Sequence, residues 1–234
     1  MGKKKTAVVF GTYILIILGL TIITYGASIA TSVVAQLIPL ERKATIIIDP
    51  GHGGMDGGAI SCSGIPESQY NLEISLKLED LFHLLGFHTK LIRRTDISVY
   101  TTGDTIAAKK VSDLRQRVRI VTETENAILL SIHQNTFTDG RYSGAQVFYG
   151  PKGEGKALAA LLQDEFRTTI NPGSQRQIKK AEGVYLMQHI NCTGVLIECG
   201  FLSNPEEEAN LKTPEYQRKI CCIIAAITGQ FLTK

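Results

Sequence analysis

The stretch Thr45-Ile46-Ile47-Ile48-Asp49-Pro50-Gly51-His52-Gly53-Gly54 decides how the rest of the chain is arranged. Its β-branched run, bounded by Pro and Gly, is typical of a strand buried on both faces. The glycine-rich loop that follows, which extends to Gly58, can adopt backbone angles closed to other residues and can approach a small ligand closely. Ligands in open α/β sheets lie beyond the carboxyl ends of the strands. His52 is therefore either a ligand or base, or an ordinary loop residue.

Apolar periodicity in the remaining chain predicts strands that alternate with helices. Further strands are expected at 87–92, 127–132, 146–149, 184–186 and 194–197. Helices are expected at 69–85, after a loop at 95–112, at 154–170 and at 214–232. Gly86 and Pro214 suit the end of the first helix and the start of the last. We predict a single α/β domain with a central mixed, mostly parallel twisted sheet, flanked by helices on both faces.

The N-terminal region differs sharply from the rest in composition. No charged residue occurs from Thr6 to Leu40, and this run exceeds the roughly 20 residues that a membrane-spanning helix needs. The lysines at 3–5 should stay cytoplasmic. We expect an N-terminal transmembrane anchor over 1–35, a tether over 36–44 and an extracytoplasmic catalytic domain over 45–234. A cleaved signal peptide is the alternative, because 28–30 and 33–35 both suit a signal peptidase.

Charge argues against one class of partner, and cysteine content limits the possible disulfide bonds. The formal net charge is only +3, with no basic stripe interleaved with aromatic residues, so nucleic acid is not an expected partner. An exported domain with five cysteines has at least one unpaired thiol, and their spacing fits no disulfide framework: Cys62, Cys192, Cys199, Cys221, Cys222. Buried free thiols are favoured. A disulfide between Cys62 and another cysteine stays open.

Four polar residues are expected to converge at one edge of the sheet. His52, His133 and Glu198 each follow an apolar strand run, and Glu67 lies at the far end of the glycine-rich loop. Two histidines and two glutamates in one crevice are what a catalytic zinc hydrolase needs: three protein ligands, an open position, and a separate carboxylate for the proton. The pattern predicts such a site.

Each of these residues also has a structural interpretation. His133 can simply end a strand, and Glu67 can stabilise the start of the helix after it. Glu198 is harder to explain in this way, because a carboxylate within an apolar run is costly to bury without a partner. There is no His-Glu-x-x-His motif. The remaining histidines are assigned structural or surface roles: His83, His88 and His189.

Four separated blocks resemble one known family. They are Ile-Ile-Asp-Pro-Gly-His-Gly-Gly at 47–54, Glu67, Ser-Ile-His-Gln-Asn at 131–135, and Val-Leu-Ile-Glu-Cys-Gly-Phe-Leu-Ser-Asn at 195–204. In this order they resemble the zinc-dependent N-acetylmuramoyl-L-alanine amidases of bacterial cell walls, over about residues 45–232. Within the family, Asp-Leu-Arg-Gln-Arg-Val at 113–118 and Gly-Val-Tyr-Leu-Met-Gln at 183–188, together with a single expected anchor and no wall-binding repeats, resemble the germination-specific amidases of the spore cortex.

The resemblance implies zinc as cofactor, with His52, Glu67 and His133 as ligands and Glu198 as the catalytic residue. It implies peptidoglycan as substrate, cleaved between N-acetylmuramic acid and L-alanine. A vegetative wall amidase, a zinc carboxypeptidase and a wall-binding protein without activity are the alternatives. Cys62 as a fourth ligand would close the open position and is not expected.

Two further expectations concern the surroundings of the site. Asp49 either orients a ligand histidine or caps its own turn, and Arg117 is expected in a structural ion pair rather than with Glu198 or substrate. Some members of the family carry a helix after the second zinc histidine that plugs the site. Here the polar stretch at 134–142 predicts a surface loop instead, with control through the timing of synthesis or an accessory protein.

Overall fold

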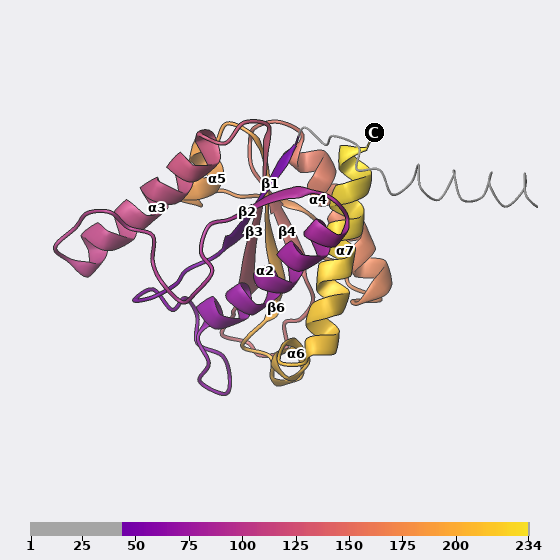
Figure 1. Ribbon diagram of the computed structural model, residues 1–234. Helices are drawn as coiled ribbons and strands as arrows, with labels where there is room; N and C mark the ends of the chain where they lie inside the picture. The colour runs from indigo at the N-terminus through magenta and orange to yellow at the C-terminus, as the bar shows by residue number, and fades with distance from the viewer. Residues whose placement is uncertain (1–43, 234) are drawn as a thin grey trace, which may run out of the picture. The chain divides into compact units, whose positions relative to one another are not determined.

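The computed structural model describes residues 44–233 (Figure 1). The predicted anchor over 1–35 lies outside the described residues, as does the predicted tether over 36–44 except for its last residue. Within the described part, no helix combines the length and the apolar character that crossing a membrane requires. The described residues therefore cover the predicted catalytic domain over 45–234 except for its last residue.

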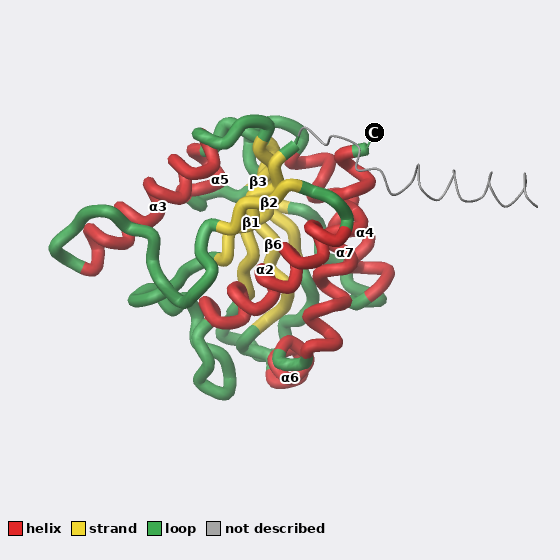
Figure 2. The backbone as a smooth tube through the Cα atoms, in the orientation of Figure 1, coloured by secondary structure: helices red, strands yellow, loops and turns green. Residues whose placement is uncertain are grey.

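A mixed sheet with the strand order β2-β1-β3-β6-β4-β5 forms the centre of this domain (Figure 2). Strands β1, β2, β3 and β6 are mutually parallel, β4 is antiparallel to β6, and β5 is parallel to β4. The strand bounds are β1 Thr45–Pro50, β2 His88–Leu91, β3 Ala127–Asn135, β4 Gln146–Tyr149, β5 Lys179–Lys180 and β6 Thr193–Phe201. The predicted mixed, mostly parallel sheet is confirmed.

Helices cover both faces of the sheet, as predicted (Figure 1). One face carries α2 (Glu67–Leu84), α4 (Gly155–Thr169) and α7 (Pro214–Leu232), and the other carries α3 (Ile106–Thr122) and α5 (Tyr185–His189). A short helix, α6 (Pro205–Leu211), follows β6. Because the apolar strands are sandwiched between two helical layers, the core is divided into a larger and a smaller apolar cluster.

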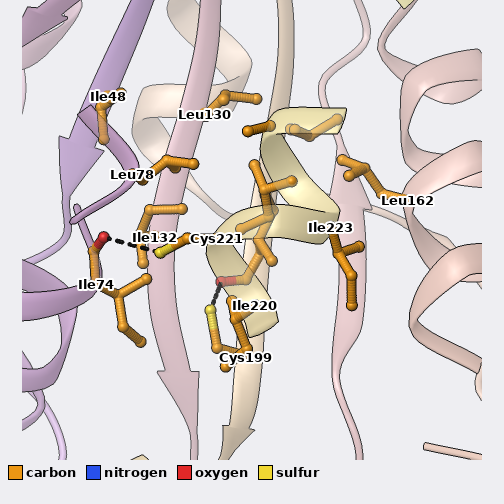
Figure 3. Packing of buried hydrophobic residues seen from close by; sticks show 14 of the residues in the cluster. Ile48, Ile74, Leu78, Leu130, Ile132, Leu162, Cys199, Ile220, Cys221 and Ile223 are labelled. Carbon is orange, nitrogen blue, oxygen red and sulfur yellow. Dashed lines mark hydrogen bonds between the residues drawn. The ribbon is translucent and has the colours of Figure 1, made fainter. Parts of the chain in front are cut away.

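The larger apolar cluster lies under α2, α4 and α7, and it contains two of the cysteines (Figure 3). Cys221 Sγ donates to the carbonyl of Ile74 at 3.4 Å, and Cys199 Sγ lies 3.8 Å from the carbonyl of Ile197. All five thiols are free. The prediction of buried free thiols is correct for Cys199 and Cys221, whereas Cys62 and Cys222 are exposed and Cys192 is half-buried.

The end of α2 shows how local sequence fixes an element boundary. Gly86 adopts φ +75°, which a residue with a side chain rarely adopts. Its N–H donates to the carbonyl of His83 at 3.0 Å, and the N–H of Phe87 donates to that of Phe82 at 2.9 Å. This is the pair of hydrogen bonds by which a glycine terminates a helix. Gly86 therefore ends the helix as predicted, although α2 begins at Glu67 rather than at 69.

Helix α3 begins earlier than the sequence suggested. The stretch 95–112 is predicted as a loop, yet the helix starts at Ile106. Thr105 caps it, because its hydroxyl accepts from the N–H of Ala108 at 3.1 Å. Alanines and lysines follow, and these are good helix formers even without an apolar period. The prediction of a long loop was therefore wrong over 106–112.

The segment 184–186 is wrongly predicted as a strand. It lies at the start of α5, where Leu186 and Met187 are both buried in the smaller apolar cluster. Both edges of β6 are already paired, with β3 and β4, and the outer edge of β4 is paired with the charged β5. Helix α6 was also missed, although Asn204 as its cap and Pro205 at its first position are recognisable signals.

Candidate metal centre and catalytic carboxylate

Strand register places a row of polar side chains across the sheet. His133 is paired with Glu198, and Glu198 is in turn opposite Gln146. All three point to the face that α3 and α5 cover, because side chains alternate along a strand and Leu129 and Leu196 lie on that face. His133 and Glu198 lie inside β3 and β6 rather than directly after them, since both strands continue beyond the predicted ends.

Glu67 joins the two predicted histidine ligands. Its Oε1 lies 2.9 Å from His133 Nδ1, and its Oε2 lies 3.2 Å from His52 Nε2. The potential ligand atoms of these three residues all lie within 4.8 Å of one another. Glu67 is the first residue of α2 and is buried. The structure therefore brings together the three residues that the sequence analysis selected from three different elements.

Glycines make room for this cluster. A Cβ on Gly51 would lie 2.2 Å from Nε2 of His133, and one on Gly58 would lie 2.5 Å from Oε2 of Glu67. His52 itself adopts φ +61°, a left-handed conformation that costs a residue with a side chain about 1–3 kcal/mol. The backbone thus approaches the cluster so closely that only glycine fits at 51 and 58, and strain is concentrated at the histidine.

The donor set of the cluster fits a zinc ion. Two imidazole nitrogens and one carboxylate are a known ligand set of catalytic zinc, which leaves a fourth position open. The two rings lie 5.0 Å apart, nearly at right angles, with Glu67 between them. Glu67 is charged, because hydrogen bonds from His133 and His52 outweigh the effect of burial and lower its pKa far below the usual range. Cys62 is not a member of the cluster, since its thiol donates to the carbonyl of Leu202 at 3.2 Å.

Asp56 is a site residue that the sequence analysis missed. Its Oδ2 lies 3.0 Å from Nδ1 of His52, and its Oδ1 accepts from Lys110 Nζ at 3.1 Å. A carboxylate on the second ring nitrogen fixes the orientation and tautomer of a metal-binding histidine. A signal was available, because Asp56 is the only acidic residue in the glycine-rich loop and lies four residues after His52.

Glu198 stands beside the cluster without a partner of its own. Its Oε2 is buried and has no hydrogen-bond partner among the described residues. Burial raises the pKa of Glu198 to about 7, a rise that the charge of His133 opposes and that of Glu67 reinforces. The pKa values of Glu67 and Glu198 are therefore shifted in opposite directions. Such a pair is typical of a charged metal ligand beside a proton-transferring group.

Asp49 does not contact a histidine and does not orient a ligand. Burial alone would raise its pKa, but the charge of Arg117 and a 2.7 Å hydrogen bond from the Ser131 hydroxyl outweigh burial and lower it. Arg117 pairs with Asp49 and with Asp113, and it also donates to the carbonyl of His52 at 2.6 Å. The expected structural ion pair is confirmed, and Arg117 is buried whereas Arg115 and Arg119 on the same helix are exposed.

The remaining predictions around the site concern the histidines and the loop after β3. His83 is exposed and hydrogen-bonds to Thr89, His189 is exposed and both hydrogen-bonds to the carbonyl of Tyr185 and stacks on its ring, and His88 is exposed as well. Residues 136–145 form a loop without a helix, as predicted, whereas Gln134 and Asn135, predicted as part of this loop, still belong to β3 and Gln134 is buried. Nothing in the described part of the chain inserts a helix from this segment into the crevice.

Comparison with known proteins connects this geometry to a family. The family of N-acetylmuramoyl-L-alanine amidases matches the chain over residues 46–228, which include all four predicted site residues. The chain belongs to this family. It is therefore a hydrolase that cleaves the amide between N-acetylmuramic acid and L-alanine of peptidoglycan, and the amidase interpretation is favoured over the carboxypeptidase and over a binding protein without activity.

Three relatives show how far the similarity extends. The germination-specific N-acetylmuramoyl-L-alanine amidase of Bacillus subtilis is 38% identical over 189 residues, covering 80% of this chain and 78% of that protein. The CwlD amidase from Clostridioides difficile, solved in complex with the GerS lipoprotein, is 35% identical, with a TM-score of 0.77 over 81% of this amidase and 98% of that chain. An amidase from Clostridium difficile 630 is 27% identical, with a TM-score of 0.70 over 83% and 99%.

Proposed function

We propose that this amidase is zinc-dependent, with His52, Glu67 and His133 as the metal ligands and Glu198 as the catalytic residue that accepts and returns the proton. The observation that carries the proposal is the position of Glu198. A buried carboxylate oxygen without a partner, beside three converging donors, is costly for a fold and useful for a reaction. A zinc ion on these ligands supplies Lewis acidity, which makes a water molecule more acidic and polarises the scissile carbonyl.

The protein side chains position the metal ligands and transfer the proton. Glu67 places one negative charge between the two histidines, and Asp56 holds the ring of His52 through Nδ1. Glu198, with a pKa of about 7, accepts a proton from water at neutral pH and passes it to the departing amine of L-alanine. A group whose pKa is close to the working pH performs both transfers with the least loss of driving force.

The spore cortex is the proposed substrate within peptidoglycan. The germination-specific role of the Bacillus subtilis relative supports this choice, and vegetative wall is the alternative. We also propose that the domain over 45–234 is extracytoplasmic and attached to the cell or forespore membrane by residues 1–35, with 36–44 as a tether. A run without charge behind three lysines supports this topology.

An accessory protein is proposed as a further partner. The related CwlD amidase was solved in complex with the GerS lipoprotein. In this chain the segment after His133 is a loop and not a helix, so control of the site by a built-in plug at this position is not expected. A separate protein that assists metal or substrate binding is compatible with a site of this form.

Digestion of purified peptidoglycan by the full-length protein tests the function. Mass spectrometry should find stem peptides with a free N-terminal L-alanine together with bare muramic acid, and a chelator should abolish this until zinc is restored. Shortened stems would show a peptidase instead, and unchanged material a binding protein. Sacculi from spores and from vegetative cells, compared at equal enzyme, decide between cortex and vegetative wall. Protease treatment of intact protoplasts should remove the domain, and full protection would contradict the topology.

A further inference from the structure

A cleft of about 850 Å³ lies beside the polar row of the sheet, on the side of β4. It is formed by the segment before β4 and by the connection from α4 to β5, and its wall includes Tyr142, Gln146, Asn171, Arg176 and Lys179. Gln146 links the cleft to the reaction site, because it is the residue directly opposite Glu198 in the antiparallel pair of β4 and β6. Substrate that extends from Glu198 across β4 therefore enters this cleft.

Arg176 is held rigidly at the wall of the cleft by neutral groups. Its Nε donates to the carbonyl of Ser143 at 2.7 Å, and its Nη1 donates to Oε1 of Gln146 at 3.0 Å. The guanidinium also lies over the ring of Phe201, 4.4 Å from its centroid. Three contacts of this kind fix a planar side chain before any ligand arrives, so little rotamer freedom remains to be lost on binding.

The charge of Arg176 is not neutralised by any carboxylate in the described part of the chain. No ion pair involves it, and its Nη2 has no hydrogen-bond partner among the described residues. Glu207 is the acidic group that influences it, but the carboxylate of Glu207 accepts from the N–H groups of Gly144 and Phe201. Burial lowers the pKa of the Arg176 guanidinium, as expected for a cation without a close counter-ion.

We infer that Arg176 binds a carboxylate of the stem peptide beyond L-alanine, and that it makes the amidase selective for stems with free carboxylates over amidated stems. The inference rests on the proposed function and adds a specificity determinant to it. Arginine with an open edge is suited to a carboxylate, because two parallel N–H groups match the two oxygens.

The position of Arg176 fits the second or third residue of the stem. Side chains directly opposite each other in an antiparallel pair, such as Glu198 and Gln146, have Cβ atoms roughly 5 Å apart. The guanidinium of Arg176 contacts the end of the Gln146 side chain, so it lies farther from Glu198 by about the length of that side chain. An extended peptide advances about 3.3–3.6 Å per residue. Lys179, exposed on the same wall and in no ion pair of the described residues, adds positive charge along this path.

The experiment compares two soluble substrates that differ only in charge. One is N-acetylmuramoyl-L-alanyl-D-glutamyl-diaminopimelate with free carboxylates on the peptide, and the other has these carboxylates as carboxamides. With zinc bound, the full-length protein should cleave the acid with a kcat/KM about ten- to hundredfold higher, as a charge-assisted hydrogen bond implies. Arg176→Gln should remove the preference by slowing cleavage of the acid alone, and Arg176→Lys should retain part of it.

Arg141→Gln is the matched control. Arg141 also lines the cleft but is exposed and already paired with Asp139, so its loss should leave the preference unchanged. A binding measurement avoids catalysis altogether: calorimetric titration of Glu198→Gln with the released tripeptide should give a Kd that rises when Arg176→Gln is added and stays constant when Arg141→Gln is added.

Equal cleavage of acid and amide by the wild-type protein overturns the inference whatever the variants do. An equal loss on both substrates in a folded Arg176→Gln protein, or an unchanged preference in it, also overturns it. If Arg176→Gln does not fold, Arg176→Lys decides, and an unchanged preference there counts against the inference. Failure of the proposed function has a different result, since neither substrate would then be cleaved with zinc present.

Discussion

Two neighbouring polar clusters meet along β3, where Ser131 and His133 lie two residues apart, and they differ in whether every charged group has a partner. The first, called the Asp49 cluster, consists of Asp49, Asp113, Arg117 and Ser131. The second, called the His–Glu cluster, consists of His52, Glu67, His133 and Glu198.

In the Asp49 cluster, each charged group has an oppositely charged partner. In the His–Glu cluster, Glu198 has a buried oxygen with no hydrogen-bond partner. Satisfied buried networks make a structure rigid, whereas an unsatisfied carboxylate lowers stability and keeps a proton acceptor available. The difference is what we expect if the Asp49 cluster stabilises the fold and the His–Glu cluster has the catalytic role proposed above. Substitutions in the Asp49 cluster should therefore lower stability, whereas substitution of Glu198 in the His–Glu cluster should lower activity and leave stability unchanged.

The largest effect is expected from removing a metal ligand. His133→Ala should abolish both stoichiometric zinc binding and hydrolysis, because only two donors of the cluster remain. Metal analysis of the purified variant, together with the peptidoglycan assay, measures both. His189→Ala is the control and should retain zinc, since this exposed histidine hydrogen-bonds to the carbonyl of Tyr185 and stacks on its ring, outside the cluster. Stoichiometric zinc in His133→Ala would exclude His133 from the ligand set.

Glu198→Gln should separate activity from stability. We expect turnover to fall about 10²–10⁴-fold, the usual contribution of a general acid-base group, with zinc content unchanged. Thermal unfolding should show no loss of stability, because the neutral amide is easier to bury than a carboxylate without a partner. Activity within a few-fold of wild type would contradict the catalytic role.

Arg117→Ala should show the reverse profile for the Asp49 cluster. Removal of one side of a buried ion pair leaves Asp49 uncompensated and should lower the free energy of unfolding by about 3–5 kcal/mol. Denaturant unfolding measures this change. Arg119→Ala on the same helix is the control, because its pair with Glu123 is fully exposed and its loss should leave the midpoint unchanged. Equal stability of the two variants would remove the distinction between the clusters.

The smallest effect is a pH dependence that belongs to the Asp49 cluster. The pKa of Asp49 is lowered in the folded state from 3.8, because the charge of Arg117 and the Ser131 hydrogen bond outweigh burial. A lowered carboxyl pKa contributes stability that is present above the unfolded value and is lost as pH falls through the folded value. The difference in unfolding free energy between wild type and Asp49→Asn should therefore shrink as pH decreases below 3.8. A constant difference from neutral to acidic pH would refute this account.

Much of the fold was determined by the sequence. The isoleucines at 46–48, the glycine that ends α2 and the proline that begins α7 carry local signals, because β-branched runs, a positive φ and a fixed φ act over a few residues. The convergence of His52, His133 and Glu198 was also predictable from the sequence, since each follows or ends an apolar strand run and the carboxyl ends of parallel strands meet at one edge of the sheet.

Only the tertiary structure decided which polar groups face one another. Arg117 was expected in a structural ion pair, but only the packing of α3 against the sheet shows that its partners are Asp49 and Asp113 and that the pair is buried. Asp56 became a partner of His52 through the turn of the glycine-rich loop, and the segment predicted as a strand at 184–186 lies at the start of α5, which buries Leu186 and Met187. The burial of Arg117 depends on contacts between residues distant in sequence, and a local pattern does not encode the geometry of such contacts. The contact between Asp56 and His52 is short in sequence, but it requires the folded conformation of the glycine-rich loop.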